Sequence, residues 1–404
     1  MQYAENSTAF RAELQELNER FENLKPEVEL TVRDPELGVT GHLVVWSTLA
    51  SRKGPLGACG KGGTRLTPTV DVAELKMLSR IQTLKNAAAG LALGGAKSGL
   101  AADPNEPGFE KKYRRFVQLL KPMLRENGGP WGGFGYDLGG NPIHCKWACD
   151  ELGSTKGFTG KPVEMGGTDY DAEGIAGLGV AQAAETLLEV KGEDPSRITC
   201  AIQGAGAMGA GVIRYFSETG ATICWISDPR LEGTWYLPEG LTQSLRDSLS
   251  SMDFAASVQE LKAGGYRQLP LEDVLFQPVD LLFPCAVQDV LHKDNEPRIQ
   301  ARYVVEGANN PLSAECRTAL HKRGVIVIPD FIANAGGVIA AYVELISTVS
   351  DEENARTRAK VSESKVMTRT KIAENVKQLL ELVKRFDVEP IDASRYIALK
   401  RIFA

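Results

Sequence analysis

The chain has 404 residues, of which 43% are apolar and 24% charged, a composition typical of a globular protein long enough for two domains. Its net charge is −6. Lysines and arginines are interspersed with acidic residues, so there is no basic stripe for nucleic acid. The most apolar tract, residues 324–346, is interrupted by Pro329, Asp330, Asn334 and Glu344. This pattern excludes an unbroken membrane span and predicts an interior segment.

The cysteines and the N-terminal residues bear on the compartment. Seven cysteines, an odd number, stand in apolar contexts, which is typical of reduced core thiols and predicts a cytoplasmic protein. The first residues read as a polar amphipathic helix without an export signal. His144, Cys145 and Cys149 are the one metal-like cluster, but no second pair of ligands follows at similar spacing. We interpret them as helix residues and predict no metal site.

The first part of the chain predicts an α/β domain. Residues 1–24 have the pattern of an amphipathic helix, 29–34 and 41–50 are strand-like, and 70–90 is helical. A glycine-dense region follows at 128–140. We therefore predict a small sheet covered by helices.

From about residue 196 the chain alternates β-branched runs with helical patterns. Residues 197–204 predict a strand, 207–219 a helix and 221–228 a second strand, which together make a βαβ unit. Three more strands, each ending in Gly, Pro, Asn or Asp, are predicted at 279–285, 302–307 and 324–330. Such alternation indicates a parallel sheet whose carboxyl ends face a ligand.

The remaining segment, 351–386, is charged and amphipathic and predicts helices that pack back on the first domain. The chain is thus expected to be an α/β protein with two domains. The first comprises residues 1–165, joined by helices from 346–404, and the second is a Rossmann-type dinucleotide-binding domain at 166–345. The working site is expected in the cleft between them.

A glycine motif marks the cofactor half. Residues 202–211, IQGAGAMGAG, follow a strand and open a helix, where the glycines allow a tight turn and close approach to a pyrophosphate. The predicted contacts are Gly204, Gly206, Ala207, Met208 and Gly209. Asp228 ends the next strand, and its carboxylate can hold both ribose hydroxyls and repel a 2′-phosphate. We predict NAD as the cofactor, with NADP less favoured; Arg230 is the residue that argues against this preference.

Four stretches flank this unit, and one of them frames a lysine with glycines. A lone G-G-x-K indicates only a turn with a solvated lysine. In chain order the stretches are 61-KGGTRL-66, 85-KNAAAGLALGGAKSGL-100, 306-EGANNPLS-313 and 329-PDFIANAGGVIAAYVE-344. Together they resemble the glutamate/leucine/phenylalanine/valine dehydrogenase superfamily, most closely its glutamate dehydrogenase branch. The resemblance runs from roughly residue 25 to 345.

The resemblance implies roles for four residues of the first domain. Lys97 and Asp137 match the catalytic lysine and aspartate, although the residues before Asp137, FGY, depart from the family's P-A-P or P-A-G. Lys85 matches the lysine that holds the substrate's α-carboxylate, and Lys61 the one that grips a side-chain carboxylate. An α-carboxylate needs one cation, a dicarboxylate needs two, and the developing iminium needs an acid/base pair.

Other matches concern the cofactor and the pocket. Asn309 and Asn334 match residues near the nicotinamide ribose and ring. Ala341 stands where the family has a serine on the substrate's side-chain carboxylate, and Ala176 where it has a threonine; Ser98 replaces a glycine. The lost hydroxyls make the predicted pocket more apolar than that of a usual glutamate enzyme.

These features predict NAD-dependent, reversible oxidative deamination of an L-amino acid, with glutamate as the expected substrate, to a 2-oxo acid and ammonia. One alternative is a dehydrogenase of neutral amino acids, against which Lys61 argues. The other is a non-catalytic regulatory paralogue that binds an amino acid, against which Lys97 and Asp137 argue. The resemblance also implies a homo-oligomer, a hexamer or octamer assembled through the first domain. No nucleic-acid or membrane partner is expected.

Overall fold

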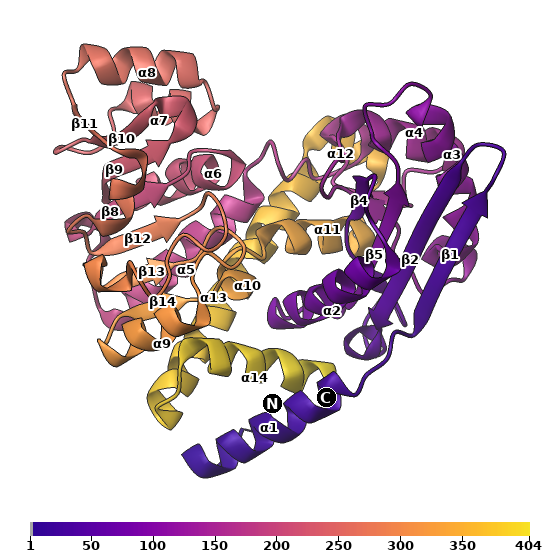
Figure 1. The fold of residues 1–404 in the computed structure, drawn as a ribbon, viewed down its shortest axis with the longest axis horizontal. Coiled ribbons are helices and arrows are strands. Elements are labelled where there is room, and N and C mark those ends of the chain that lie inside the picture. The colour runs from indigo at the N-terminus through magenta and orange to yellow at the C-terminus, as the bar shows by residue number, and fades with distance from the viewer. Residues whose placement is uncertain (1–2) are drawn as a thin grey trace.

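The computed structural model describes residues 3–404 and contains two main sheets, seen at opposite sides of Figure 1. Helices α10 (Asp330–Ala333), α11 (Gly336–Ile346) and α13 (Ala359–Phe386) lie between the two sheets. The predicted α/β class is confirmed.

The first sheet is built around β5. Its strands are β1 (Val28–Asp34), β2 (Val39–Ser47), β3 (Gly60–Lys61), β4 (Thr64–Thr67) and β5 (Gly94–Ala101). Strands β1, β2 and β5 are antiparallel neighbours, whereas β3 and β4 both run parallel to β5. Helices α2 (Val72–Ala88) and α3 (Phe109–Leu120) cover opposite faces of the sheet. Successive residues of β2 point to opposite faces, so they pack against different helices. Accordingly Leu43 belongs to the cluster of Phe116, while Val44 clusters with Leu75 of α2.

The glycine-framed lysine stands on a strand at the centre of this sheet, and no surface turn forms there. A Cβ atom at Gly95 would lie 2.2 Å from Thr83 Oγ1 and 2.3 Å from the Thr83 backbone nitrogen. Helix α2 can approach β5 this closely only over a residue without a side chain. The glycines therefore set the distance between helix and strand, and Lys97 projects from a buried strand.

A short connecting region follows the first sheet. It contains α4 (Pro142–Leu152) and a parallel two-stranded ribbon of β6 (Phe134–Gly135) and β7 (Phe158–Thr159). His144, Cys145 and Cys149 lie on α4, as predicted, and His144 Nδ1 accepts a hydrogen bond from the Asn141 backbone in a capping box.

The second sheet has seven strands in the order β11-β10-β9-β8-β12-β13-β14. They are β8 (Thr199–Gln203), β9 (Thr222–Asp228), β10 (Gly233–Tyr236), β11 (Arg267–Leu269), β12 (Leu281–Pro284), β13 (Tyr303–Val305) and β14 (Ile326–Ile328). The five predicted strands are present and parallel. An antiparallel edge of β10 and β11, with α7 (Gln243–Ser250) and α8 (Phe254–Ala263), was not predicted, since its strands are only three or four residues long.

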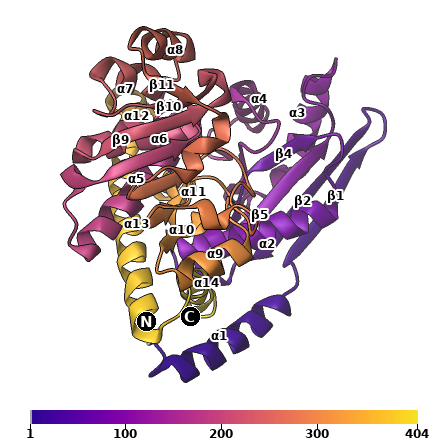
Figure 2. The ribbon, with the colours of Figure 1, turned by 60° about the vertical axis from the view of Figure 1, so that its left-hand side comes forward.

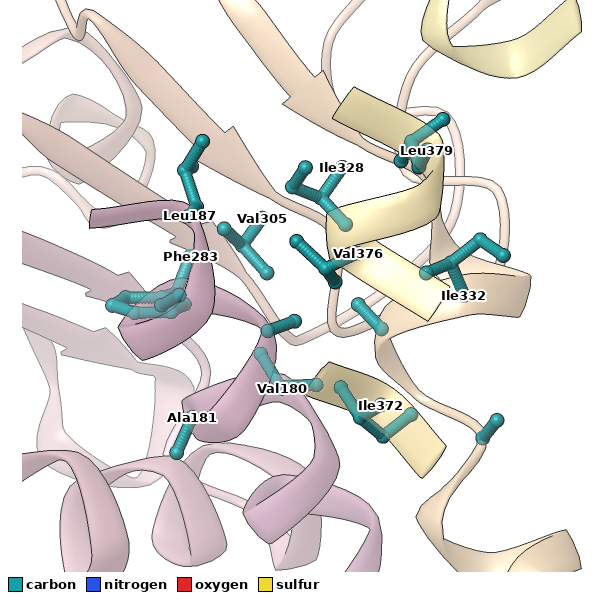
Figure 3. Packing of buried hydrophobic residues seen from close by; sticks show 14 of the residues in the cluster. Val180, Ala181, Leu187, Phe283, Val305, Ile328, Ile332, Ile372, Val376 and Leu379 are labelled. Atoms are coloured by element: carbon teal, nitrogen blue, oxygen red, sulfur yellow. The ribbon is translucent and has the colours of Figure 1, made fainter. Parts of the chain in front are cut away.

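Helices α5 (Ile175–Lys191) and α13 share the core on one face of this sheet, and Figure 3 shows their side chains interlocking. Val180 of α5 and Val376 of α13 meet Phe283 and Ile328 from the strands. The other helices of this half are α6 (Ala207–Phe216) and α9 (Ala314–Lys322). This packing fixes the start of α5, which borders the site described below.

The C-terminal helices contact both halves. Helix α13, preceded by α12 (Asp351–Thr357), packs against α5 and α11, whereas α14 (Pro390–Ile402) packs against α2 and α1 (Ser7–Glu22) (Figure 2). The rings of Phe10 and Tyr396 join α1 to α14. Arg401 donates to the carbonyls of Ala87 and Ala88 at the end of α2.

Three sequence-based expectations can be compared directly with the fold. Within residues 3–404 no helix has the length and apolar character needed to cross a bilayer. All seven cysteines are buried and none forms a disulfide. The apolar tract 324–346 supplies β14, α10 and α11 and is largely interior, as predicted.

Candidate active site

A cavity of about 350 Å³ lies between the first sheet and the helices of the second half. Strands β3 and β5 and helix α2 provide one wall, and the starts of α5, α6 and α11 provide the other. Eight of the residues singled out in the sequence line it: Lys61, Lys85, Lys97, Ala176, Met208, Asn309, Asn334 and Ala341. The fold therefore brings together motifs that are up to 280 residues apart in the chain.

Lys97 and Asp137 form an ion pair at this cavity. Lys97 Nζ lies 2.9 Å from Asp137 Oδ2, and the lysine is only 9% exposed. Arg65 Nε lies 3.4 Å from the same carboxylate oxygen. Burial works to raise the pKa of Asp137, but the charges of Lys97 and Arg65 and the hydrogen bond from Lys97 hold that pKa below its ordinary value. The aspartate is thus kept ionised beside a cationic donor.

The ammonium group of Lys61 is held by backbone carbonyls. Its Nζ donates to the carbonyls of Gly62 at 3.0 Å and Phe134 at 2.9 Å. An ammonium has three donors, so one N–H remains for a ligand in the cavity. Burial lowers the pKa of Lys61 to about 7; the negative charge of Glu344 opposes this shift and the positive charge of Lys97 adds to it. A carboxylate in the cavity would restore the charged form.

Lys85 reaches the cavity from the last turn of α2. Burial lowers its pKa, against the opposing charge of Asp330. The next residue, Asn86, donates to the carbonyls of Lys61 and Gly94 and so fixes β3 and β5 relative to the helix. Three lysines therefore face one space from three adjoining elements.

The opposite wall carries the two asparagines. Asn334 Nδ2 donates to the Gly307 carbonyl at 3.0 Å and to Asn309 Oδ1 at 3.1 Å. Asn334 Oδ1 is buried without a hydrogen-bond partner. A buried acceptor left unpaired is costly, which points to a ligand donor at this position.

A second cavity, of about 660 Å³, opens at the carboxyl ends of β8, β9 and β12. Gly204, Gly206, Ala207, Met208 and Asp228 line it. Gly204 has φ +89°, and a Cβ on Gly209 would lie 1.8 Å from the Gly204 carbonyl oxygen, so both positions require glycine. Gly206 caps α6 without a side chain, leaving the first helical amides free for a phosphate.

Two features of this second cavity suit a dinucleotide: its unpaired polar groups and its connection to the first cavity. Gln203 Oε1 and Ser227 Oγ are buried without partners at its edge. Met208 lines both cavities, so a cofactor lying along the β8–α6 turn can extend from one into the other.

Both carboxylate oxygens of Asp228 already accept hydrogen bonds from the protein. Its Oδ1 accepts from Arg230 N and Nε at 2.9 and 2.8 Å, and its Oδ2 accepts from Ala205 N and Arg230 Nη2 at 2.9 Å each. The Arg230 guanidinium lies over the ring of Phe254. The sequence argument for NAD assumed a free carboxylate, and this pairing weakens it.

The departures from the family pattern are also located. Ala176 and Ala341 both line the lysine cavity, whereas Ser98 points away from it and bonds Thr64 Oγ1 at 2.9 Å. Sequence reasoning missed several polar lining residues, among them Thr159, Tyr170 and Asp171. Thr159 ends the two-residue strand β7, and Tyr170 and Asp171 lie outside helices and strands, so no periodicity or motif marked them.

A parallel sheet with a glycine turn, next to a cavity of lysines, defines a dinucleotide-dependent oxidoreductase. Comparison with family models agrees: residues 166–404 match Glutamate/Leucine/Phenylalanine/Valine dehydrogenase, and residues 38–151 match the Glu/Leu/Phe/Val dehydrogenase dimerisation domain. The chain belongs to the glutamate/leucine/phenylalanine/valine dehydrogenase family. It is an amino acid dehydrogenase of the NAD(P)-dependent kind.

Individual relatives give the same result. The chain is 33% identical over 345 residues to the NADP-specific glutamate dehydrogenase of Saccharolobus shibatae, covering 81% of this chain and 79% of that one. It is 34% identical over 317 residues to the NADP(+)-dependent glutamate dehydrogenase of Pyrobaculum calidifontis, covering 74% and 73%. The fold matches a hetero-hexameric glutamate dehydrogenase from Thermus thermophilus in a Leu-bound form, with TM-score 0.71, 26% identity and coverage of 100% and 97%.

Proposed function

We propose that this chain catalyses the reversible oxidative deamination of L-glutamate to its 2-oxo acid and ammonia. The observation that carries the choice of glutamate is Lys61, which two carbonyls anchor so that one N–H remains for a ligand. With Lys85 it supplies two separate cations in one cavity. Two cations suit a dicarboxylate, and a neutral amino acid needs only one.

The roles of the reacting groups follow from the ion pair. A dinucleotide held along the β8–α6 turn would supply the acceptor for the α-hydrogen of the substrate as hydride. Lys85 holds the α-carboxylate and Lys61 the side-chain carboxylate, which orients the α-carbon between the two halves. Lys97 assists the attack of water on the imino acid and stabilises the charge that develops. Asp137, held ionised by Lys97 and Arg65, takes the proton from the substrate nitrogen or from water.

For the cofactor, we propose that NAD is used and that Arg230 sets how well NADP is accepted. Asp228 lies at the end of β9, where its carboxylate can meet the adenosine ribose. Arg230 neutralises that carboxylate and carries an exposed guanidinium, which is the group that binds a 2′-phosphate. The names of the Saccharolobus and Pyrobaculum relatives make NADP a realistic second cofactor.

The alternatives remain distinct from this proposal. A neutral-amino-acid dehydrogenase would leave the buried Lys61 without a partner in the substrate complex. A regulatory paralogue would not need Lys97 and Asp137 as an ion pair. We further propose a homo-oligomer, by analogy with the family; the hetero-hexameric Thermus structure supports an oligomer but not identical subunits.

The test compares two lysine variants. Lys61→Leu leaves the side-chain carboxylate of bound glutamate unpaired, a cost on the order of 3 to 5 kcal/mol. We expect kcat/KM for glutamate to fall about a hundredfold or more by that cost, while norvaline, which has a methyl group instead of the carboxylate, loses little.

Lys85→Leu serves as the matched control, since both substrates carry an α-carboxylate and should lose equally. Steady-state NADH or NADPH formation measures all four combinations. If Lys61→Leu harmed glutamate and norvaline to the same extent, Lys61 would not contact the side chain. If the wild type oxidised norvaline but not glutamate, the substrate assignment would be wrong.

A further inference from the structure

Beside Lys61, the cavity contains two hydroxyl groups that no sequence motif indicates, on Thr159 and Tyr170. The short ribbon of β6 and β7 positions them. Gly135 of β6 pairs with Thr159 of β7, and a Cβ on Gly135 would lie 2.9 Å from Lys61 Nζ and 3.3 Å from Thr159 Oγ1. The ends of the lysine and threonine side chains therefore lie on the same side of Gly135.

Tyr170 reaches the same ribbon from the following loop. A Cβ on Gly160, the residue after Thr159, would lie 2.7 Å from Tyr170 Oη. Only a glycine there lets the phenol tip come this close, and φ of +87° at Gly160 also favours glycine. The polar ends of Lys61, Thr159 and Tyr170 thus all lie beside the β6–β7 ribbon, and all three residues line the same cavity as Ala341.

A carboxylate held beside this ribbon needs more donors than Lys61 has free. Its two oxygens accept about four hydrogen bonds when ionised, and Lys61 can supply one. Ala341 and Ala176 offer no hydroxyl. Hence a buried side-chain carboxylate would remain underpaired without further donors.

We propose that Tyr170, assisted by Thr159, donates a hydrogen bond to the side-chain carboxylate of the substrate and thereby determines specificity for an acidic amino acid. The inference rests on the proposed function, since it concerns the same site and takes glutamate as the ligand. In this proposal Tyr170 replaces the hydroxyl group that is missing at Ala341 of helix α11.

The state of the phenol agrees with a donor role. Burial, together with the negative charges of Asp171 and Glu344, keeps the pKa of Tyr170 well above its ordinary value, so the hydroxyl stays protonated. Asp171 also lines the cavity; burial of its carboxyl group and the negative charge of Asp169 raise its pKa, which disfavours the charged form beside a bound carboxylate.

The experiment measures kcat/KM for glutamate and norvaline in the wild type and in Tyr170→Phe, which removes only the hydroxyl. We expect the glutamate value to fall at least about tenfold, the range for a hydrogen bond to a charged group, with norvaline changed less than about twofold by the same reasoning. Thr159→Val should shift the ratio in the same direction, and Thr159→Ser, which keeps a hydroxyl, should restore it.

Tyr136→Phe is the matched control, because Tyr136 lines the same cavity but its hydroxyl interacts with Cys145. Its glutamate-to-norvaline ratio should equal that of the wild type. Equal losses for both substrates in Tyr170→Phe would overturn this inference and leave the glutamate assignment intact. A wild type that oxidises norvaline and not glutamate would overturn both.

Discussion

At the scale of single residues, the site depends on how charges are paired before a ligand arrives. Lys97 is paired with Asp137, and Asp228 with Arg230, whereas Lys61 has only carbonyl partners. Each arrangement is expected to affect a different property. The ion pair at Lys97 should affect the rate of the chemical step, Lys61 without an anionic partner should affect binding of the substrate's side chain, and the pair at Asp228 should affect cofactor choice.

Replacing Lys97 by Ala should remove the cationic acid/base and leave Asp137 with Arg65 as its remaining cation. We expect kcat to fall at least about a hundredfold, the lower range for a positioned acid/base. Binding of NADH or NADPH, followed by fluorescence titration, should persist, because the dinucleotide cavity lies on the other half. A variant with wild-type turnover would rule out a catalytic role for this lysine.

The buried Lys61 should make glutamate binding depend on pH. With a pKa of about 7 in the free site, the lysine is charged below pH 7 and a carboxylate binds it without proton uptake. Above pH 7 the free site is neutral, so binding must take up a proton and weakens, by up to about tenfold per pH unit. The ratio of kcat/KM for glutamate to that for norvaline should therefore fall between about pH 7 and 9, and a flat ratio would contradict the proposed contact.

Arg230→Ser tests cofactor choice. Removing the guanidinium frees the Asp228 carboxylate, which would then repel a 2′-phosphate while remaining available to the ribose hydroxyls of NAD. We expect kcat/KM for NADP to fall at least about tenfold, as for loss of a charge-assisted hydrogen bond, and that for NAD to change little. Parallel losses for the two cofactors would mean that Arg230 only supports the loop.

At the scale of secondary-structure elements, close contact between α2 and β5 holds the lysines together. Gly95→Ala should disturb it, because the new methyl would lie 2.3 Å from a backbone nitrogen of α2. Overpacking of this kind costs about 1 to 3 kcal/mol and should lower the thermal unfolding midpoint and the activity together. Gly337→Ala is the control for stability, since a Cβ there meets nothing within 4 Å; similar midpoints for both variants would contradict the argument.

At the scale of the whole molecule, the active site is expected to be complete within one chain. Lys61, Lys85, Lys97 and Asp137 all come from the same chain as the dinucleotide cavity. We therefore expect the chain purified alone to oxidise glutamate. From the family resemblance we also expect a homo-oligomer, a hexamer or octamer, whose mass light scattering after size-exclusion chromatography would measure. An inactive preparation that gains activity only with a second, different subunit would favour the regulatory alternative.

Local sequence patterns predicted much of the fold. The β-branched runs at 197–204 and 221–228 and the glycine motif between them predicted β8, α6 and β9, because burial on both faces and a phosphate-binding turn constrain residue types locally. The edge strands β10 and β11 escaped prediction, since strands this short have too few residues to display a period. The sequence predicted that C-terminal helices join the first domain, but not which contacts they make, since the α14 contact with α2 depends on residues more than 300 positions apart.

For the site, the sequence by itself indicated the candidate residues, because four stretches in the right order resemble those of one dehydrogenase family. Only the tertiary structure decided how their charges are compensated. It pairs Lys97 with Asp137, occupies Asp228 with Arg230, and brings Tyr170 from an unpatterned loop to the ribbon beside Lys61. Charge compensation and desolvation depend on distances in space that no local pattern encodes, so the chemistry could be read from the sequence while specificity required the fold.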